Sequence, residues 1–431
     1  MKRKLQALIL ILILTASLPG CANSGAKSRG VGDGSFEVNQ SLNPNYACTI
    51  DVCSSWGNFE ALDEAAYQFK AYYPNIEVVH NTLSDYMQDL RNRMTTGKGV
   101  DIFMCDSYIP YNEEDSWLWE NAQDLSEIGL DLEQITTQRL ETGYVEDKLA
   151  LVPVYDFMAG LAVNVTLLKE NGLEVPRSQE EFIHCLEVLK ANGYTPLLVK
   201  SPRFLVNAYF GDAYRTILGR QDANSCWEMI LEGKDPDGIL QKKLDQVSAL
   251  YEKGYVHPES EQLADEYGAV IMRFLEGDIP FFATHSSYYS GTKKREAKSE
   301  AFCEKPFEYA FIPFPGEEGP VCVYRQTNSQ YFGVYDGIED EKKAYVDEFL
   351  RYLLTQGSAQ TMEQIKNMPV ANDAISHENF PYLYGDGASD VYKIYVGSDQ
   401  NAGSFEKAEG MLWEAGTKFN PGMNATEYLN K

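Results

Sequence analysis

The chain of 431 residues has few residues of the kinds that build disulfide frameworks and metal sites. It contains eight cysteines and five histidines. The histidines are scattered, and no two of them have the spacing of metal ligands. The cysteines after Cys21 form an odd, widely spaced set, which is a poor disulfide framework for so long a chain, although one remote pair, such as Cys303 with Cys322, stays open. We therefore expect no bound metal and no cofactor.

Basic residues are also scarce relative to acidic ones. The chain has 37 Lys and Arg residues against 64 Asp and Glu residues, a formal net charge of -27. A surface of this sign repels the phosphate backbone of nucleic acids, so we exclude nucleic acid as a partner. It also disfavours adhesion to anionic lipids beyond a covalent anchor.

Only one long hydrophobic run occurs, and it stands near the start. Three basic residues precede the apolar stretch from Leu5 to Leu14, and no later run approaches the roughly 18 residues that cross a bilayer. This arrangement is typical of an export signal. The following Leu18-Pro19-Gly20-Cys21 resembles the bacterial lipobox, whose cysteine carries diacylglycerol. We predict a signal peptide over residues 1–20 and a lipid anchor on Cys21 at the extracellular face of the cell membrane; a plain secretory signal is the alternative.

Sequence motifs of common catalytic sites are missing as well. The chain has no Gly-x-Ser-x-Gly elbow, no His-Glu-x-x-His metal site and no Gly-Lys-Ser/Thr phosphate loop. A glycosidase needs two carboxylates about 5–10 Å apart, and nothing in the sequence marks such a pair among the 64 acidic residues. We therefore expect the protein not to be an enzyme.

The segments that are present alternate between strand and helix patterns. Residues 21–45, rich in Ser, Gly and Asn, predict a flexible tether. The first strands are expected at 48–54, 76–80 and 100–105, with helices at 59–73 and 84–97 between them. Further strands are expected at 149–155, 160–165, 279–284 and 307–315, and further helices at 178–193, 239–253 and 340–356. Such alternation predicts an α/β fold with doubly wound, parallel sheets.

Ligands of parallel sheets bind beyond the carboxyl ends of the strands, where the loops converge. This rule selects Ser55 and Trp56 after the first strand, and Asp106, Ser107 and Tyr108 after the third. Hydroxyls and a carboxylate beside flat rings suit a sugar, whose hydroxyls lie at its edge and whose C–H groups form a face. The alternative for Trp56 is packing beneath its loop.

Several segments resemble the family 1 extracellular solute-binding proteins of ABC importers, the maltose-binding-protein class. The segments that carry the resemblance are Leu62–Phe69 with Tyr73–Val78, Thr96–Ile102, Val152–Val154, Gly172–Ser178, Phe274–Asp278, Phe311–Gly316 and Met368–Val370. Each motif is loose alone, but their order and spacing agree with the family over about residues 48–430. The sequence departs from the family pattern at Val100, where a proline is usual, and at Val163, where a tyrosine is common.

The resemblance implies a periplasmic-binding-protein-like fold of type II, with two doubly wound α/β lobes joined by a hinge. Mapped onto this chain, lobe one takes residues 46–156 and 278–318, and lobe two takes 157–277 and 319–431. Solute would bind in the cleft between the lobes.

The family's contact positions, mapped by the resemblance, extend the candidate site. They add Asp156 at the first crossover, Arg203 and Phe204 after a strand, Tyr288 where many members place a tryptophan, and Tyr324 and Arg325 where the chain re-enters the second lobe. For the two arginines the alternative is a solvated or salt-bridged surface position. His285, just before Tyr288, could bond a ligand or be a structural histidine.

We therefore predict a monomeric, membrane-anchored protein that captures a sugar or oligosaccharide and delivers it to the permease subunits of an ABC transporter. A non-sugar polar solute, such as a sugar phosphate, is the alternative within the class, because guanidinium groups match phosphate. A tethered carbohydrate-active enzyme or a surface adhesin is the alternative outside it.

Overall fold

Five strands form the first main sheet of the computed structural model, which describes residues 36–106, 116–263, 267–385, 388–397 and 403–430. The strands are β1 (Cys48–Ser54), β2 (Ile76–Thr82), β3 (Ile102–Asp106), β6 (Val152–Tyr155) and β13 (Gln330–Val334), in the order β2-β1-β3-β13-β6. β1 is parallel to β2 and β3, as the sequence predicts, whereas β13 is antiparallel to both of its neighbours. We call this sheet and its helices the first lobe.

The helices of the first lobe follow from amphipathic segments. They are α1 (Glu60–Phe69), α2 (Tyr86–Thr96), α3 (Ser116–Glu120), α4 (Thr137–Leu140), α14 (Asp340–Leu353) and α15 (Gln356–Lys366), with a short hairpin of β4 (Tyr144–Val145) and β5 (Lys148–Leu149). Leu62 and Phe69 on the inner face of α1 are buried. Gly97 ends α2 in the left-handed conformation, at φ 61°, which glycine adopts without a steric penalty.

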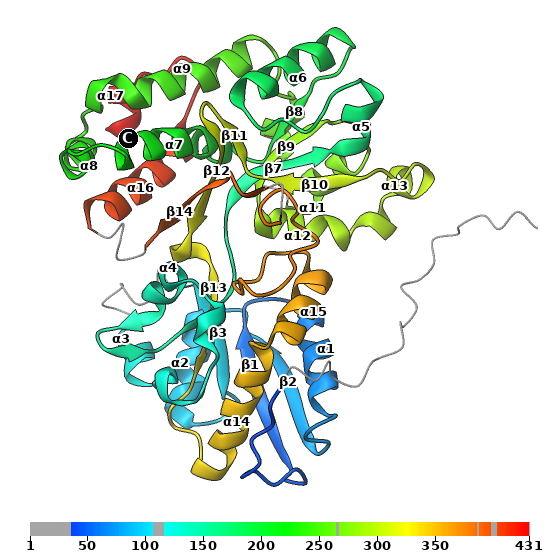
Figure 1. Cartoon of the computed structure of the whole chain (residues 1–431), viewed down its shortest axis with the longest axis vertical. Coiled ribbons are helices and arrows are strands. Elements are labelled where there is room, and N and C mark those ends of the chain that lie inside the picture. The colour runs from blue at the N-terminus through cyan, green and yellow to red at the C-terminus, as the bar shows by residue number, and fades with distance from the viewer. Residues whose placement is uncertain (1–35, 107–115, 264–266, 386–387, 398–402, 431) are drawn as a thin grey trace, which may run out of the picture. The chain divides into compact units, whose positions relative to one another are not determined.

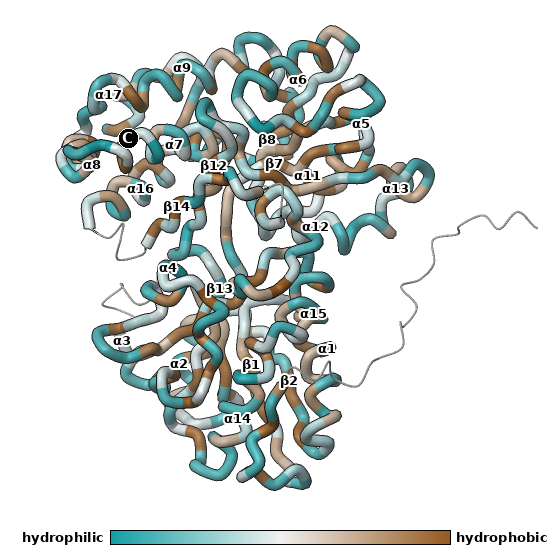
Figure 2. Tube along the Cα trace, viewed as in Figure 1, coloured by the Kyte–Doolittle hydropathy of each residue, from teal (hydrophilic) through white to brown (hydrophobic). Residues whose placement is uncertain are grey.

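A second main sheet has the order β10-β7-β9-β8, and a smaller one has the order β11-β12-β14. The strands are β7 (Ala159–Asn164), β8 (Leu197–Val199), β9 (Phe281–His285), β10 (Tyr309–Ile312), β11 (Phe314–Gly316), β12 (Gly319–Arg325) and β14 (Tyr392–Val396). Every residue of β7 is buried, and Figure 2 shows brown, hydrophobic positions in this central strand. We call these two sheets and their helices the second lobe.

Helices of the second lobe surround these sheets (Figure 1). They are α5 (Val165–Glu170), α6 (Gln179–Ala191), α7 (Pro202–Leu218), α8 (Ala223–Leu231), α9 (Ile239–Glu252), α10 (Glu259–Leu263), α11 (Tyr267–Phe274), α12 (Ser286–Lys293), α13 (Glu300–Glu304), α16 (Ser404–Ala415) and α17 (Ala425–Leu429). The predicted cap of α6 is present, since Ser178 Oγ accepts a hydrogen bond of 3.2 Å from the Glu181 amide. In the described ranges, no helix has the length and apolarity of a membrane span.

The strand pairing differs from the predicted division of the lobes. Residues 278–318 were expected in lobe one, but β9 and β10 both pair with β7 of the second lobe. β13 in turn pairs with β3 of the first lobe, although residues 319–431 were expected in lobe two. The apolar pattern of a strand shows that it is buried, but its partner strand is remote in sequence. For this reason the pattern cannot assign it to a sheet.

The predicted tether also extends too far. Phe36 is 7% exposed and packs with Tyr72 and Tyr352 at ring-centroid distances of 5.2 and 5.3 Å. The backbone amide of Asn39 donates to Glu348 Oε1 at 2.7 Å. Residues 36–45 are therefore attached to α14 of the first lobe. The polar composition of this segment did not predict that Phe36 packs in the lobe or that its backbone forms hydrogen bonds with α14.

No disulfide bond joins any two cysteines of the described region. Cys303 is exposed, whereas Cys322 is buried with its Sγ 3.6 Å from Met158 Sδ. The pair that the sequence left open is not formed.

Candidate functional site

Trp56 lies in the loop that follows β1 and faces a cavity. Its amide donates to Ser54 Oγ at 3.1 Å, and Thr82 Oγ1 donates to its carbonyl at 2.8 Å. The half-buried ring packs against Phe59 and Tyr155, with centroids 4.8 and 5.6 Å apart. Part of the ring thus packs beneath its loop, and part of it lines the cavity. Contact between Trp56 and a ligand stays a prediction.

A lysine covers the ring of Trp56. Lys366, the last residue of α15, places its Nζ 3.8 Å from the ring centroid, within the range of a cation–π contact. Burial and the neighbouring Lys294 lower the pKa of Lys366 to about 8, while Glu60 acts in the opposite direction. The ammonium is therefore poorly solvated and lacks a sufficient counter-charge.

The cavity beside Trp56 has a volume of about 520 Å³ and draws its lining from both lobes. Ser55, Trp56, Gly57, Asn58, Lys366 and Met368 line it from the first lobe; Tyr267, Ser287, Ser290, Lys294, Arg295 and Lys298 are among those that line it from the second. The lining thus combines hydroxyls, an amide, cations and two aromatic rings.

One ion pair links the two lobes at the edge of the cavity. Lys294, just after α12, donates to Glu60 Oε2 at 2.5 Å and to Asn58 Oδ1 at 3.3 Å. Partial burial raises the pKa of the Glu60 carboxyl, but the hydrogen bond from Lys294, a backbone hydrogen bond and the charges of Lys294 and Lys366 together keep it below its usual value. This contact holds the loop after β1 against the end of α12.

Five rings of the second lobe gather near the crossover between the main sheets. His285 lies 4.5 Å from Phe157, 4.7 Å from Phe204 and 4.7 Å from Tyr288 between ring centroids. Trp413 of α16 meets Phe204 edge-on at 5.5 Å. Burial, with Lys200 nearby, lowers the pKa of His285 to about 3, so its imidazole is neutral at physiological pH.

The structure brings the predicted residues Arg203 and Arg325 together on one tryptophan. Their guanidinium carbons lie 5.1 and 4.0 Å from the ring centroid of Trp413. Each also forms an ion pair with α16, Arg203 with Glu414 at 3.2 Å and Arg325 with Glu409 at 2.9 Å. Phe204 lies beside them and is 9% exposed. The two guanidinium groups are thus partnered within the protein.

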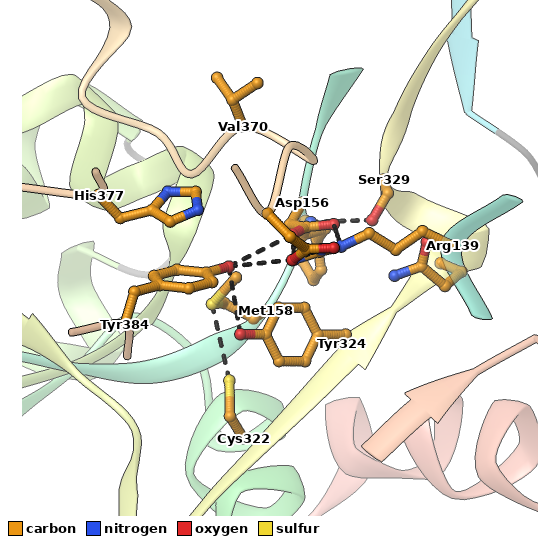
Figure 3. A network of polar contacts seen from close by, with 12 residues as sticks. Arg139, Asp156, Met158, Cys322, Tyr324, Ser329, Val370, His377 and Tyr384 are labelled. Carbon is orange, nitrogen blue, oxygen red and sulfur yellow. Dashed lines mark hydrogen bonds and ion pairs between the residues drawn. The ribbon is translucent and has the colours of Figure 1, made fainter. Parts of the chain in front are cut away.

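Asp156 and Tyr324 take part in an internal network instead of facing a cavity (Figure 3). Asp156, at the crossover between β6 and β7, is completely buried and pairs with the equally buried Arg139 at 2.7 Å. The Tyr324 hydroxyl donates to that of Tyr384 at 3.2 Å, and Tyr384 reaches Asp156 at 3.4 Å. In this arrangement neither predicted residue is accessible to a ligand.

Other predicted residues are placed only in part or not at all. Asp106 ends β3, where its backbone pairs with Gln330 of β13. Ser107, Tyr108 and Cys21 lie outside the described residues. Tyr288 lies on α12 against His285 and against Tyr267, whose ring centroid is 4.4 Å away. Considering the described residues alone, no group of three His, Cys, Asp or Glu side chains could hold a metal ion.

Sequence reasoning missed the cations of the cavity and the tryptophan of α16. Lys366 stands at the end of a helix, where a lysine is common. Trp413 stands within an amphipathic helix, where a buried tryptophan is common. Their roles arise from packing against residues remote in sequence: Lys366 on Trp56, and Trp413 on Phe204 and Arg325. No local pattern marks such contacts.

Comparison with known proteins agrees with this architecture. The family model described as bacterial extracellular solute-binding protein matches residues 54–360. The multiple sugar-binding protein of Streptococcus mutans is 22% identical over 265 residues, which are 60% of this chain and 60% of that relative's length. The chain therefore matches less than two thirds of the length of this curated relative.

Solved structures show the same fold at low identity. The apo-form of RafE from Streptococcus pneumoniae is 18% identical, with a TM-score of 0.66 over 92% of this chain and 97% of that one. RafE in complex with raffinose has a TM-score of 0.65 over 89% and 97% of the two chains, also at 18% identity.

Proposed function

Because the chain belongs to the bacterial extracellular solute-binding protein family, we propose that it captures a sugar or oligosaccharide between its lobes. It then delivers the sugar to the permease subunits of an ABC transporter. The observation that carries this proposal is the cavity of about 520 Å³ that residues of both lobes line. A ligand in that space touches both lobes at once, so it favours the arrangement in which the lobes approach each other.

The chemistry of the lining favours a saccharide. Trp56 and Tyr267 supply rings, and Ser55, Ser287 and Asn58 supply polar groups that bond hydroxyls. The names of the relatives support the same class, since one is a multiple sugar-binding protein and another was solved with raffinose.

Export and anchoring complete the proposal. Residues 1–20 act as the signal peptide, and Cys21 carries the lipid that holds the protein on the extracellular face of the membrane. Two acyl chains suffice for stable attachment. The protein acts as a monomer, since delivery requires contact with the permease and not with a second copy.

Thermal denaturation against a panel of mono- and oligosaccharides tests the proposal. Ligand at about a hundred times its dissociation constant stabilises a protein by roughly 2.7 kcal/mol. For a saccharide that raises the melting temperature, Trp56→Ala should weaken binding by about 1–3 kcal/mol, the transfer energy of a buried apolar side chain. That loss corresponds to a roughly five- to 150-fold larger Kd.

A matched control separates lost contact from lost stability. Tyr392 is an aromatic residue outside the cavity, exposed by 37%, with the Arg215 guanidinium 4.8 Å above its ring. Tyr392→Ala should leave the affinity unchanged. Equal affinity of wild type and a well-folded Trp56→Ala variant would remove Trp56 from the site. Turnover of a bound saccharide, seen by chromatography, would favour the enzyme alternative instead.

A further inference from the structure

The cavity beside Trp56 is basic, although the protein as a whole is strongly acidic. Lys294, Arg295, Lys298 and Lys366 line the cavity, and among the residues that the structure describes no Asp or Glu does. The chain carries a formal net charge of -27. A concentration of one sign of charge in a concave site attracts ligands of the opposite sign.

The cations are only partly compensated by the protein. Lys294 pairs with Glu60 at 2.5 Å, and Arg295 donates to the carbonyl of Gly291 at 3.1 Å while it lies 4.9 Å from the ring centroid of Tyr267. Lys298 and Lys366 form no ion pair with any described residue. Two positive charges therefore face the cavity without an acidic partner in the described part of the chain.

Helix ends alone do not explain this cluster. A helix C-terminus modestly stabilises a nearby exposed cation; Lys366 is the last residue of α15, and the other three cations follow the end of α12. Lys366, however, is partly desolvated, and burial together with Lys294 opposes its charge. Desolvation of an unpaired ammonium exceeds what a helix end supplies. The ammonium of Lys366 is therefore less stable than one in water, and an anion in the cavity would stabilise it.

The contact between Lys366 and Trp56 also restricts the ligand. The ammonium lies 3.8 Å from the ring centroid and covers the face of the ring on its side. A neutral sugar stacking on that face must displace the ammonium. A sugar with a negative substituent keeps it in place, because the substituent pairs with Lys366 while the sugar ring remains beside Trp56.

Resting on the saccharide-binding function above, we propose that the saccharide captured here carries an anionic group, which pairs with Lys366, Lys298 and Arg295 in the cavity while Trp56 contacts the sugar ring. The group is a uronic-acid carboxylate, or a sulfate or phosphate ester, which share the oxygen acceptors that ammonium and guanidinium groups bind.

Calorimetric titration of the mature protein with paired saccharides tests this proposal. Each acidic disaccharide is compared with its neutral counterpart: a uronic-acid disaccharide, a sulfated disaccharide and a phosphorylated disaccharide. At least one acidic member should bind roughly tenfold or more tightly than its counterpart, since a charge-assisted hydrogen bond is stronger than a neutral one. The three acidic arms identify the anionic group.

Variants of the two unpaired lysines locate the effect. Lys366→Met and Lys298→Met should each weaken the acidic saccharide by roughly tenfold and change the affinity for the neutral one by less than about twofold. Lys234→Met, an exposed lysine that pairs with Glu232 outside the cavity, is the control and should change neither. Lys366→Arg keeps a positive charge and should preserve most of the affinity.

The pH dependence of the affinity for the acidic saccharide distinguishes a ligand-binding lysine from a structural one. Lys366 is charged below its pKa of about 8 and faces Glu60 and Lys294. Affinity for the acidic saccharide should therefore fall between about pH 7 and pH 9 in the wild type and stay level in Lys366→Arg, since arginine remains charged.

The outcomes separate this proposal from the general function. Neutral saccharides that bind as tightly as acidic ones overturn the anionic ligand and leave saccharide capture intact. Acidic binding that survives both lysine variants overturns the assigned site. Binding by no member of either panel overturns saccharide capture as well.

Discussion

Arg139 holds the carboxylate of Asp156 through two hydrogen bonds, of 2.7 and 3.2 Å, and both side chains are completely buried. The backbone of Asp156 accepts from Ser286 Oγ of the second lobe at 2.9 Å, and its amide donates to Pro369 of the segment after α15 at 2.9 Å. The pair therefore fixes the chain at the point where it leaves the first sheet for the second.

Breaking this pair should destabilise the protein strongly. Arg139→Met leaves the Asp156 carboxylate buried without its partner, which costs about 3–5 kcal/mol in comparable sites. The loss should appear as a lower urea midpoint. In Arg139→Met/Asp156→Asn the buried charge is gone, so part of the stability should return. A double variant whose loss equals the sum of both single losses would contradict the coupling.

A second prediction concerns acid stability and His285. Its pKa is about 3 in the folded protein against an ordinary 6.5, so between these values the unfolded chain binds more protons than the folded one. The free energy of unfolding therefore rises with pH across this window and is lost as the pH falls. Each pH unit contributes about 1.4 kcal/mol from a single group.

Denaturation at several pH values checks this effect. His285→Gln should reduce the slope of the free energy of unfolding against pH between about pH 6 and pH 4. The reduction should correspond to the binding of about one proton fewer on unfolding. His184, an exposed histidine on α6, provides the control, and His184→Gln should keep the wild-type slope. Identical slopes in all three proteins would show that His285 titrates normally.

Local sequence patterns predicted the helices and strands well, because helix caps, helix-ending glycines and prolines, and hydrophobic periodicity act within a few residues. The strand at 48–54, the helix closed by Gly97 and the helix capped by Ser178 are present as predicted. The α/β fold of this family is confirmed by the solved relatives. Family membership also confirms a solute-binding protein in place of an enzyme.

The lobe division and part of the candidate site could not be predicted, because they depend on contacts between residues remote in sequence. Residues 278–318 were assigned to the wrong lobe because the partner of β9 is β7, more than a hundred residues earlier. The loop rule found Trp56, which lines the cavity. It did not find Lys366, because its contact with Trp56 depends on where α15 ends in space. Asp156 was selected as a contact of the ligand, yet its charge is matched internally by Arg139, a residue without any motif.

A third prediction concerns Phe36, which attaches residues 36–45 to the first lobe. Phe36 packs with Tyr72 and Tyr352 beneath the Arg351 guanidinium, 5.7 Å from its ring centroid. Phe36→Ala should lower the free energy of unfolding by about 3 kcal/mol, as for other buried aromatic residues. Glu37→Ala changes an exposed neighbour and is the control. Equal denaturation midpoints would mean that residues 36–45 detach in solution.

The last prediction concerns Cys21, whose thiol is the group that a diacylglycerol anchor requires. Cells fed an alkyne-labelled fatty acid should label the wild-type protein and not Cys21→Ser, because serine cannot form the thioether. The variant should also leave the membrane fraction or keep its signal peptide uncleaved. Cys303→Ser removes an exposed thiol elsewhere and should be labelled like the wild type. Label on Cys21→Ser would show that the lipid is attached at another residue. Release of unlabelled wild type into the medium would show that the protein is secreted without an anchor.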